Sequence, residues 1–390
     1  MKYTYAVLGA GRQGTAAAYD MAVHGDAASV ILADADFDTA CQAADRVNQL
    51  AGTSIVQSLR VDATDLEALS NLLDGVHAFL SAVPYYYNLD LTGVAVKAGT
   101  SMCDLGGNTS IVRLQHAYDQ QARSAGISII PDCGQVPGLG SSLVAYTMGL
   151  LDEPLDVYMW DGGLPQNPKP PFNYLLTFNI AGLTNEYAEP AVFLRDGKVV
   201  EVEPMTELET VDFPPPIGKL EAFVAGGGTS TMPWTFQGRL RTLQNLTLRY
   251  PGSFTQLRAF WDLGLWDTNP VKVAGLDVVP RQVFHALFEP KVTSPHGKDI
   301  VLVRVKALGI KDGRPAEALV ELIDYYDEKT GFTAMERSTG WSAAVVAEMM
   351  AHGQTKRGAG GVETFVPPAL FIEALRQRGL QISERVVFRS

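Results

Sequence analysis

The chain has 390 residues, of which 46% are hydrophobic and 19% are charged, and this composition excludes a disordered protein. Its length predicts two or three domains rather than a single core. With 43 acidic and 31 basic residues the net charge is −12, which argues against a nucleic-acid partner, because binding phosphates requires a basic face.

The cysteines, the histidines and the apolar segments narrow the class of protein further. Cys41, Cys103 and Cys133 form no CxxC pair, and none of the 6 histidines pairs with another at metal-ligand spacing. We therefore expect neither a disulfide framework nor a metal site. No apolar run is long enough to span a bilayer, and we interpret the apolar start as a strand rather than a signal peptide. These features predict a cytoplasmic protein that binds no membrane.

Short apolar segments alternate with amphipathic segments in the first 150 residues or so. Apolar segments predict strands at residues 3–8, 29–33, 54–61, 78–82, 101–104 and 127–131. Amphipathic segments between them predict helices at residues 13–23, 38–50, 65–73, 89–97 and 111–124. This alternation is typical of a Rossmann-type, doubly wound parallel α/β sheet.

The pattern changes near residue 153, where prolines cluster and strand-like segments begin to dominate. Strands are expected at residues 156–160, 242–250, 301–308 and 318–326, and Asp312-Gly313 predicts a tight hairpin between the last two. Helices are expected at residues 340–351 and 368–378. We therefore divide the chain into a Rossmann-type α/β domain (1–138), an α+β domain with a mixed or antiparallel sheet (139–339), and a C-terminal helical segment (340–390).

A glycine motif follows the first expected strand and opens the first expected helix. Gly9 permits the sharp turn, Gly11 lets a pyrophosphate approach the backbone, and Gly14 lets the helix pack on the sheet. Arg12 and Gln13 lie within the same motif and are cofactor-binding candidates. Together with the strand and the helix, the motif predicts a dinucleotide-binding turn rather than an ordinary tight turn.

Acidic residues at the ends of the next two strands bear on the same cofactor. Asp34 ends the second strand about 20 residues after Gly14, where a carboxylate accepts hydrogen bonds from the adenosine ribose and repels the 2′-phosphate of NADP. This favours NAD. Asp62 follows the third strand and is a candidate adenine contact, but it could equally belong to the start of the helix at Leu66.

Ligands of open α/β sheets bind at the carboxyl ends of the strands, and three loops of the first domain begin there. The cofactor-binding candidates in these loops are Ala82, Val83, Pro137 and Gly138. Asp104 is the candidate acid or base, unless it caps a helix or a turn. Tyr85 either orients substrate and nicotinamide or lines the wall of the cleft.

Motifs spread over most of the chain resemble the saccharopine dehydrogenase-like family, and within it the lysine 6-dehydrogenases most. The matching residues are 9–14, Tyr85 and Asn88, 104–107, 132–138, 162–165, 221–223, 227–231 and 355–358. The resemblance implies NAD-dependent oxidative deamination of the ε-amine of L-lysine, with release of ammonia, to 2-aminoadipate 6-semialdehyde, which cyclises to a piperideine carboxylate. It also implies that the first domain (1–138) binds NAD and that the second domain (139–339) binds substrate and forms the oligomer contacts of a homo-oligomer, a dimer or higher. The C-terminal helices (340–390) are expected to return to the first domain.

One residue departs from the family pattern. Asn108 stands where the lysine enzymes have a histidine after the Asp-Leu-Gly-Gly stretch, and an amide cannot titrate as a base. Asn108 therefore keeps a catalytic position in our assignment but puts the identity of the substrate in question. Two alternatives stay open: a saccharopine- or carboxynorspermidine-type dehydrogenase that acts on a secondary amine, and a non-catalytic NAD-binding sensor.

The implied amino-acid substrate also needs donors for its α-carboxylate. The loop at residues 227–231 offers Thr229 and Ser230, and Arg239 is the cationic candidate, with Lys219 and Arg241 as further choices. Each of these cations could instead be a solvated surface charge.

Overall fold

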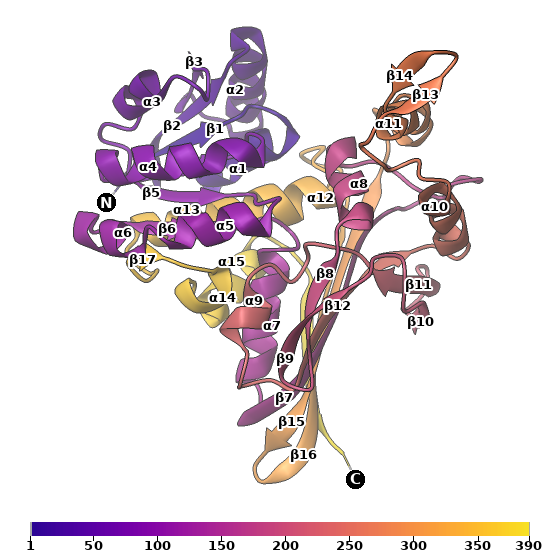
Figure 1. Cartoon of the computed structure of the whole chain (residues 1–390). Coiled ribbons are helices and arrows are strands. Elements are labelled where there is room, and N and C mark those ends of the chain that lie inside the picture. Colours follow the sequence, from indigo (N-terminus) through magenta and orange to yellow (C-terminus); the bar gives the residue numbers. More distant parts are fainter. Residues whose placement is uncertain (1, 390) are drawn as a thin grey trace.

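Residues 2–389 are described by a computed structural model, whose first domain is built on a seven-stranded sheet (Figure 1). Every neighbouring pair of strands in this sheet is parallel. The order across the sheet is β17 (Gly358–Ala359), β6 (Ser128–Ile130), β5 (Ser101–Asp104), β4 (Ala78–Ser81), β1 (Tyr3–Leu8), β2 (Ala27–Asp34) and β3 (Val56–Arg60). This arrangement confirms the predicted doubly wound α/β domain.

Helices cover both faces of the first sheet, as its alternating side chains require. Tyr5 and Val7 of β1 pack into one hydrophobic cluster, and Ala6 and Leu8 pack into another on the opposite face. The first face is covered by α1 (Arg12–His24), α2 (Phe37–Ala51) and α13 (Ser342–Ala351). The second face is covered by α3 (Leu66–Leu72), α4 (Asn88–Ala98) and α6 (Asp119–Ala125). A 3₁₀ turn, η1 (Tyr85–Tyr87), directly precedes α4, and α5 (Thr109–His116) lies beside α4.

The prediction of a single helix at residues 111–124 is wrong, because the structure has two helices there, α5 and α6. Asp119 begins the second helix, and its Oδ1 accepts a hydrogen bond from the backbone N of Ala359 at 3.0 Å. Asp119 also pairs with Arg123 within α6. The break places Asp119 in contact with β17. This strand comes from much later in the chain, so no local sequence pattern reveals the contact.

The second domain carries a nine-stranded mixed sheet. Its main path is β10 (Glu209–Asp212), β11 (Lys219–Val224), β12 (Thr242–Arg249), β7 (Glu153–Pro165), β15 (Asp299–Lys311), β16 (Arg314–Tyr325) and β18 (Ile382–Phe388), with β8 (Ala191–Arg195) and β9 (Lys198–Val202) alongside β12. Only β12 and β7 pair in parallel, and the other pairs are antiparallel. Asp312 and Gly313 both have positive φ, which confirms the predicted hairpin turn between β15 and β16.

Helices of the second domain gather at the two ends of this sheet. At the lower end in Figure 1, α7 (Leu139–Gly149) packs on β7 and β15. At the upper end, the elements are α8 (Ile180–Ala188), α10 (Ser253–Asp262), α11 (Pro280–Val292) and a small hairpin of β13 (Val271–Val273) and β14 (Leu276–Val278). A short α9 (Met232–Thr235) lies between the domains. Among the described residues, no helix combines the length and apolar character needed to cross a membrane.

The C-terminal part of the chain visits both domains. After α12 (Ala334–Glu336) and a π turn (Arg337–Trp341), α13 packs on β4 and β5 of the first sheet and β17 extends that sheet. The chain then forms α14 (Val362–Phe365) and α15 (Pro368–Gln377) against α7, and β18 closes the edge of the second sheet. The packing of α13 confirms the prediction that the C-terminal helices return to the first domain. Neither β17 nor β18 was predicted from the sequence, because each is recognisable only beside the sheet that it extends.

A buried ion cluster fastens this C-terminal part to the first domain. Arg378 donates from Nε to Asp20 of α1 at 2.8 Å and from Nη2 to Glu348 of α13 at 2.6 Å. All three side chains are less than one tenth exposed. Burial raises the pKa of both acids, while the positive charge of Arg378 opposes the shift. The arginine is therefore what makes two neighbouring buried carboxyl groups tolerable.

We predict that Arg378→Ala lowers the free energy of unfolding by about 3–5 kcal/mol, because it leaves two buried acids without their cation. Acidic pH should restore part of the loss, since protonation removes the uncompensated charges and both folded-state pKa values are already raised. Urea unfolding at several pH values measures both effects. Arg376→Ala, which removes an exposed pair with Glu384, is the matched control. A loss no larger than that of the control would contradict the prediction.

Candidate functional site

Two glycines of the first turn are required by packing, and the third is not. Gly9 has a φ of +96°, and a Cβ there would lie 2.7 Å from the Ala82 carbonyl oxygen. A Cβ on Gly14 would lie 1.8 Å from the Gly9 carbonyl oxygen. A Cβ on Gly11 would meet no described atom within 4 Å. Gly11 stands at the N-cap of α1, so this open face suits the close approach of a phosphate group.

Asp34 is held beside this turn by the backbone. Its Oδ2 accepts from Ala10 N at 2.8 Å and its Oδ1 accepts from Asp36 N at 3.0 Å. The side chain is only partly buried, so its oxygens can still accept ribose hydroxyls. Together, Gly11 and Asp34 fit the pyrophosphate and the adenosine ribose of a dinucleotide.

The other cofactor candidates that follow the first three strands make different contacts. Arg12 donates from Nε to Glu336 Oε1 at 2.7 Å, which ties the glycine turn to α12. Gln13 has a buried Oε1 without a hydrogen-bond partner among residues 2–389. Asp62 accepts from the backbone N and the hydroxyl of Thr64, and these bonds lower its pKa. Asp62 therefore organises its own turn, while Asp65 caps α3.

The loop after β4 approaches both the glycine turn and the loop after β5. A Cβ on Gly9 would also lie 3.3 Å from Val83 Cγ1, so Ala82 and Val83 line the glycine turn. The ring of Tyr85 lies against Gly107, where an added Cβ would be 3.1 Å from Tyr85 Cδ1. The ring therefore forms part of the wall between two strand ends.

Asp104 proves to be an internal support. It is 0% exposed. Its Oδ1 accepts from Gly106 N at 2.8 Å and Asp132 N at 3.1 Å, and its Oδ2 accepts from Gln115 Nε2 at 2.8 Å. The structure thus gives Asp104 the turn role that the sequence left open, because hydrogen bonds from the protein occupy both of its carboxylate oxygens.

Asn108 also has a structural role. Its Oδ1 accepts from Ile111 N at 3.1 Å and caps α5, an interaction typical of asparagine at this position. This cap explains a local preference for Asn108, and a histidine would satisfy it less well. The side chain is partly buried at the same strand edge.

Asp132 is the titratable residue that sequence reasoning passed over. It follows β6 with a φ of +58° and is 5% exposed. Ser230 of the second domain donates its hydroxyl to Asp132 Oδ2, and Asp132 Oδ1 has no hydrogen-bond partner among the described residues. Burial, and then the charge of Asp104, raise the pKa of Asp132 to about 7. The signal available in the sequence was its position at a strand end before the Gly134 and Pro137-Gly138 turn.

Pro137 and Gly138 shape the turn after Asp132. Gly138 has a φ of +126°, and a Cβ there would lie 2.3 Å from the Gly134 carbonyl oxygen. The Val136–Pro137 peptide is cis. Because α7 begins directly after Gly138, this tight turn leads the chain from the dinucleotide-binding sheet into the second domain.

The substrate candidates of the second domain separate into two groups. Ser230 reaches Asp132, whereas Thr229 donates its hydroxyl to the Val192 carbonyl at 2.7 Å and so holds the loop to β8. Arg239 is exposed and lies over the ring of Phe236 at 5.6 Å. Arg241 is bound through two hydrogen bonds to Asp156, and Lys219 is exposed. Arg239, Arg241 and Lys219 are therefore surface charges, which was the alternative left open for each of them.

Further acids line the second domain close to Asp132. Asp161 of β7 accepts from Asn245 Nδ2 at 2.9 Å, and burial raises its pKa to about 6. A Cβ on Gly228 would lie 2.2 Å from the same Asn245 atom and 3.2 Å from Val136 Cγ1. The Gly228 loop therefore joins Asp161 and Asn245 to the segment that follows Asp132. Nearby, Glu363 Oε1 accepts from Thr231 and Thr235 at 3.2 and 2.6 Å.

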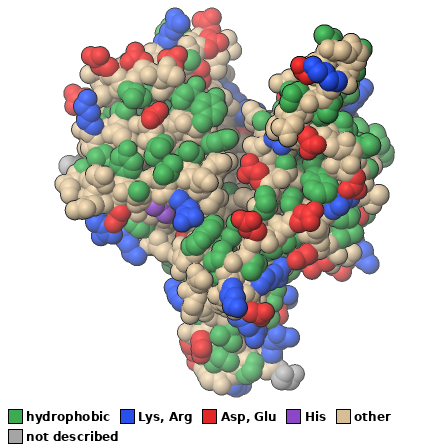
Figure 2. All heavy atoms as spheres, viewed as in Figure 1, with side chains coloured by type: hydrophobic (Ala, Val, Ile, Leu, Met, Phe, Trp, Pro, Cys, Tyr) green, Lys and Arg blue, Asp and Glu red, His purple; other side chains and the backbone are tan. Residues whose placement is uncertain are grey.

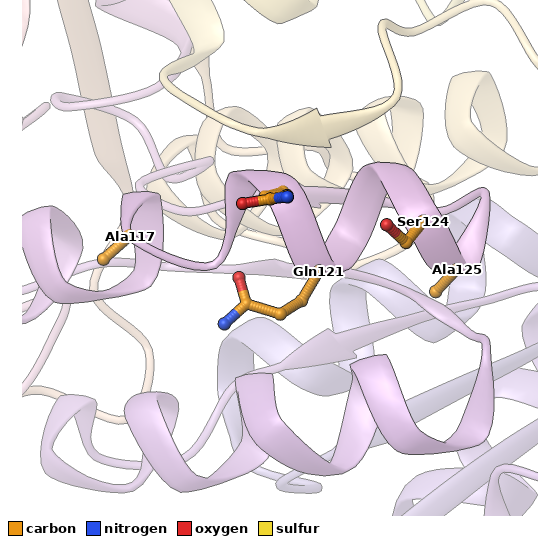
Figure 3. Close-up of a pocket in the computed structure, with 5 residues that line it drawn as sticks. Ala117, Gln121, Ser124 and Ala125 are labelled. Carbon is orange, nitrogen blue, oxygen red and sulfur yellow. The ribbon is translucent and has the colours of Figure 1, made fainter.

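The surface is hollowed between the first domain and the upper part of the second (Figure 2). The strand-end loops stand on one side of this hollow and α8 stands on the other (Figure 1). A separate surface pocket on α6 has no titratable side chain (Figure 3). Its lining residues are Ala117, Gln120, Gln121, Ser124 and Ala125. This pocket therefore offers no acid or base for catalysis.

No group of three or more histidine, cysteine or acidic side chains stands ready to hold a metal ion within residues 2–389. Cys103 and Cys133 are buried, and His285 contacts the Thr184 hydroxyl at 3.0 Å. The titratable groups of the site are thus carboxylic acids.

Models of known protein families match both domains. The saccharopine dehydrogenase NADP binding domain matches residues 5–130, and the saccharopine dehydrogenase C-terminal domain matches residues 134–380. Mitochondrial alpha-aminoadipic semialdehyde synthase of Bos taurus is 23% identical over 358 residues, covering 74% of this chain and 38% of the bovine protein. The Rattus norvegicus protein is 24% identical over 209 residues, covering 51% and 22%. The chain thus spans well under half the length of these relatives.

Solved structures share the fold at low sequence identity. Saccharopine dehydrogenase (L-Glu forming) from Saccharomyces cerevisiae has a TM-score of 0.79 and 18% identity, with 99% of this chain and 100% of that chain covered. Homospermidine synthase from Legionella pneumophila, in complex with NAD, has a TM-score of 0.65 and 12% identity, with 99% and 92% covered. These matches support the predicted fold class, and the matched family domain identifies residues 5–130 as a nicotinamide-dinucleotide-binding domain.

We predict that alanine substitutions at two glycines of the turn have different effects, one on NADH binding and the other on stability. Gly11→Ala should leave stability nearly unchanged, because its Cβ meets no described atom, but weaken NADH binding at least tenfold by crowding the pyrophosphate. Gly14→Ala should lower the melting temperature, because its Cβ collides with the Gly9 carbonyl. Differential scanning fluorimetry and an NADH fluorescence titration separate the two effects. Normal NADH binding by Gly11→Ala would refute the assignment.

Proposed function

Since the chain belongs to the saccharopine dehydrogenase family, we propose that it is an NAD-dependent dehydrogenase that oxidatively deaminates the ε-amine of L-lysine. The products are ammonia, NADH and 2-aminoadipate 6-semialdehyde, which cyclises to a piperideine carboxylate. The observation that carries the proposal is Asp132, a buried acid with a pKa of about 7 between the dinucleotide-binding sheet and the second domain. Such a group can exchange a proton with an amine at neutral pH.

Asp34 supports NAD as the cofactor, although the matched family domain is described as NADP binding. Its carboxylate is fixed at the end of β2 by Ala10 N and Asp36 N, where it would repel a 2′-phosphate. The residues that follow it are Ala35 and Asp36, so the adjacent chain offers no cation to a 2′-phosphate. NAD, when bound, supplies the hydride acceptor.

The residues of the cleft would prepare the amine for hydride loss. Asp132 accepts a proton from the ε-ammonium, while the Ser230 hydroxyl donates to Oδ2 and orients the carboxylate. Oδ1, which is buried against Gly106 and makes no side-chain hydrogen bond within residues 2–389, is the atom to which we assign that proton. Loss of hydride from C6 then leaves an iminium ion, and water adds to C6 and releases ammonia. The enzyme returns to its starting state when Asp132 gives up its proton.

The acidic lining of the cleft suits a cationic substrate. Glu363 lies close enough to Asp132 to raise its pKa, and Asp161 is held nearby by Asn245. Carboxyl groups gathered in a partly enclosed cleft attract an ammonium group more strongly than they would in water. This favours an amine over an anionic substrate at the reacting end.

A saccharopine-type dehydrogenase is the second candidate, because the matched family domains and the yeast structure carry that name. Such an enzyme, like a carboxynorspermidine-type dehydrogenase, acts on a secondary amine that joins two carbon skeletons. Its substrate would need more carboxylate-binding groups, and the candidate cations Lys219, Arg239 and Arg241 lie at the surface. A non-catalytic NAD-binding sensor would make no use of Asp132.

The proposal predicts that the purified protein reduces NAD with L-lysine, and absorbance of NADH measures the reaction. A panel of amines, with NADP in parallel, tests substrate and cofactor together. No signal with L-lysine, but NADH oxidation by 2-aminoadipate semialdehyde plus glutamate, would instead support the saccharopine-type reaction. Binding of NADH without turnover of any amine would support the sensor.

Substitution of Asp132 should remove the base without unfolding the protein. We predict that Asp132→Asn lowers kcat about 10²–10⁴-fold. In the parent enzyme, kcat/KM should rise with pH through about 7, since only the ionised acid accepts a proton. Melting should not fall, because burying the ionised acid already costs stability above its unfolded pKa. Asp74→Asn, on an exposed turn of the same domain, is the control.

Ser230→Ala provides an independent check on the same group. The Ser230 hydrogen bond lowers the pKa of Asp132, so its loss should move the acidic limb of the pH profile to higher pH. An unchanged limb in Ser230→Ala, or full activity in Asp132→Asn, would show that another residue is the base.

A further inference from the structure

An arginine of the glycine turn keeps part of its guanidinium free. Arg12 is the first residue of α1, directly after Gly11, and its side chain is 50% exposed. Its Nε donates to Glu336 Oε1 at 2.7 Å, and neither Nη1 nor Nη2 makes a hydrogen bond within residues 2–389. Arg12 therefore has spare donors next to the open face of Gly11, where the pyrophosphate of a dinucleotide is expected.

The carboxylate that holds Arg12 is itself fixed by its surroundings. Glu336 is 6% exposed in its side chain. Its Oε2 accepts from Thr333 N at 2.8 Å, and the Thr333 hydroxyl accepts from Glu336 N at 3.1 Å. This reciprocal capping box leaves Oε1 to accept from Arg12. The position of the guanidinium is thus set by a side chain from the far end of the chain.

Helix α12 is fastened to both domains. Asp299 of β15 accepts from Ala334 N at 2.7 Å and from Met335 N at 2.9 Å, and it is 0% exposed. The π turn that follows α12 packs against α1, where a Cβ on Gly340 would lie 2.7 Å from the Gln13 carbonyl oxygen. Through α12, the second sheet is therefore connected to the start of α1 (Figure 1).

An arginine that is already held binds an anion at a lower cost than one that moves freely. A free arginine side chain loses rotamer entropy when it binds, and a carboxylate that fixes it beforehand reduces that loss. The hydrogen bonds from a guanidinium to a phosphate are charge-assisted, and its parallel donors fit phosphate geometry. The negative charge of Glu336 acts in the opposite direction, because it repels the phosphates. Since Arg12 neutralises this charge at 2.7 Å, we expect the gain from positioning to exceed the repulsion.

We propose that Arg12 binds the pyrophosphate of the cofactor through its free Nη groups, and that Glu336 is the positioning residue that holds Arg12 for this contact. The second domain thereby takes part in binding the cofactor, although the glycine motif lies wholly in the first. The inference does not depend on the proposed deamination, because it concerns the cofactor and not the amine that is oxidised.

Affinities for NADH, ADP-ribose and adenosine locate the contact. NADH fluorescence measures the first affinity, and displacement of NADH measures the other two. We expect Arg12→Gln to weaken NADH and ADP-ribose, which both carry the pyrophosphate, about tenfold, and to leave adenosine, which has no phosphate, unchanged. Arg123→Gln removes the same charge from an exposed ion pair on α6 and should change none of the three.

A double-mutant cycle tests the role of Glu336. Glu336→Ala should weaken NADH binding about fivefold in the parent protein but not in Arg12→Gln, where the carboxylate has no arginine to position. A merely structural role of Glu336 would weaken NADH binding equally in both backgrounds. Arg12→Lys, which keeps the charge but not the planar fork, should retain part of the affinity.

Four results would overturn the inference: unchanged NADH affinity in Arg12→Gln, an equal loss of adenosine affinity, a larger loss for NADPH than for NADH, and tighter NADH binding by Glu336→Ala. The third would move the contact to the 2′-phosphate, and the fourth would make Glu336 a competitor of the phosphates. Differential scanning fluorimetry verifies that the variants are folded, and Arg12→Lys carries the test if Arg12→Gln is not. Absence of turnover with L-lysine would refute the proposed function and leave these affinities unaffected.

Discussion

The hydrogen bonds of one buried carboxylate, Asp104, hold together the two loops on which the site is built. Oδ1 draws in the backbone N–H groups of Gly106 and Asp132, and Oδ2 binds Gln115. A hydrogen bond to a charged group contributes about 1.5–3 kcal/mol, so the bond from Asp132 N helps to hold Asp132 at its positive φ. The same closeness lets the charge of Asp104 raise the pKa of Asp132. Asp104 thus both positions Asp132 and contributes to the rise of its pKa.

Most of the first sheet and the hairpin turn at Gly313 could be predicted from sequence, because both depend on local patterns: short apolar runs, a glycine motif, and a two-residue turn with positive φ. The roles of the site residues were harder to predict. Asp104 ends β5 and Asp132 follows β6, and only the packed structure shows that both oxygens of Asp104 accept hydrogen bonds while Asp132 Oδ1 has no partner among the described residues. The same limit applies to Arg249, whose charge looks no different in sequence from that of Arg239, although one is buried and the other exposed.

The acids of the cleft also illustrate how burial tunes a site in an acidic protein. Asp132 and Asp161 both have raised pKa values, and desolvation is the largest cause for each. Their pKa values of about 7 and 6 lie near neutrality, so the charge of the cleft depends on pH and on what is bound. A cationic amine bound beside these acids would lower the cost of keeping them enclosed.

The path of the last part of the chain has a consequence for how the protein is made. β17 completes the first sheet and β18 completes the second, and they lie some 24 residues apart near the end of the described chain. A ribosome that has finished residue 330 has therefore delivered neither edge, nor Arg378, whose partners Asp20 and Glu348 belong to α1 and α13. Neither domain can reach its final form during synthesis of its own portion of the chain. The two domains must mature together, and a nascent chain would expose unfinished sheet edges until its last strands emerge.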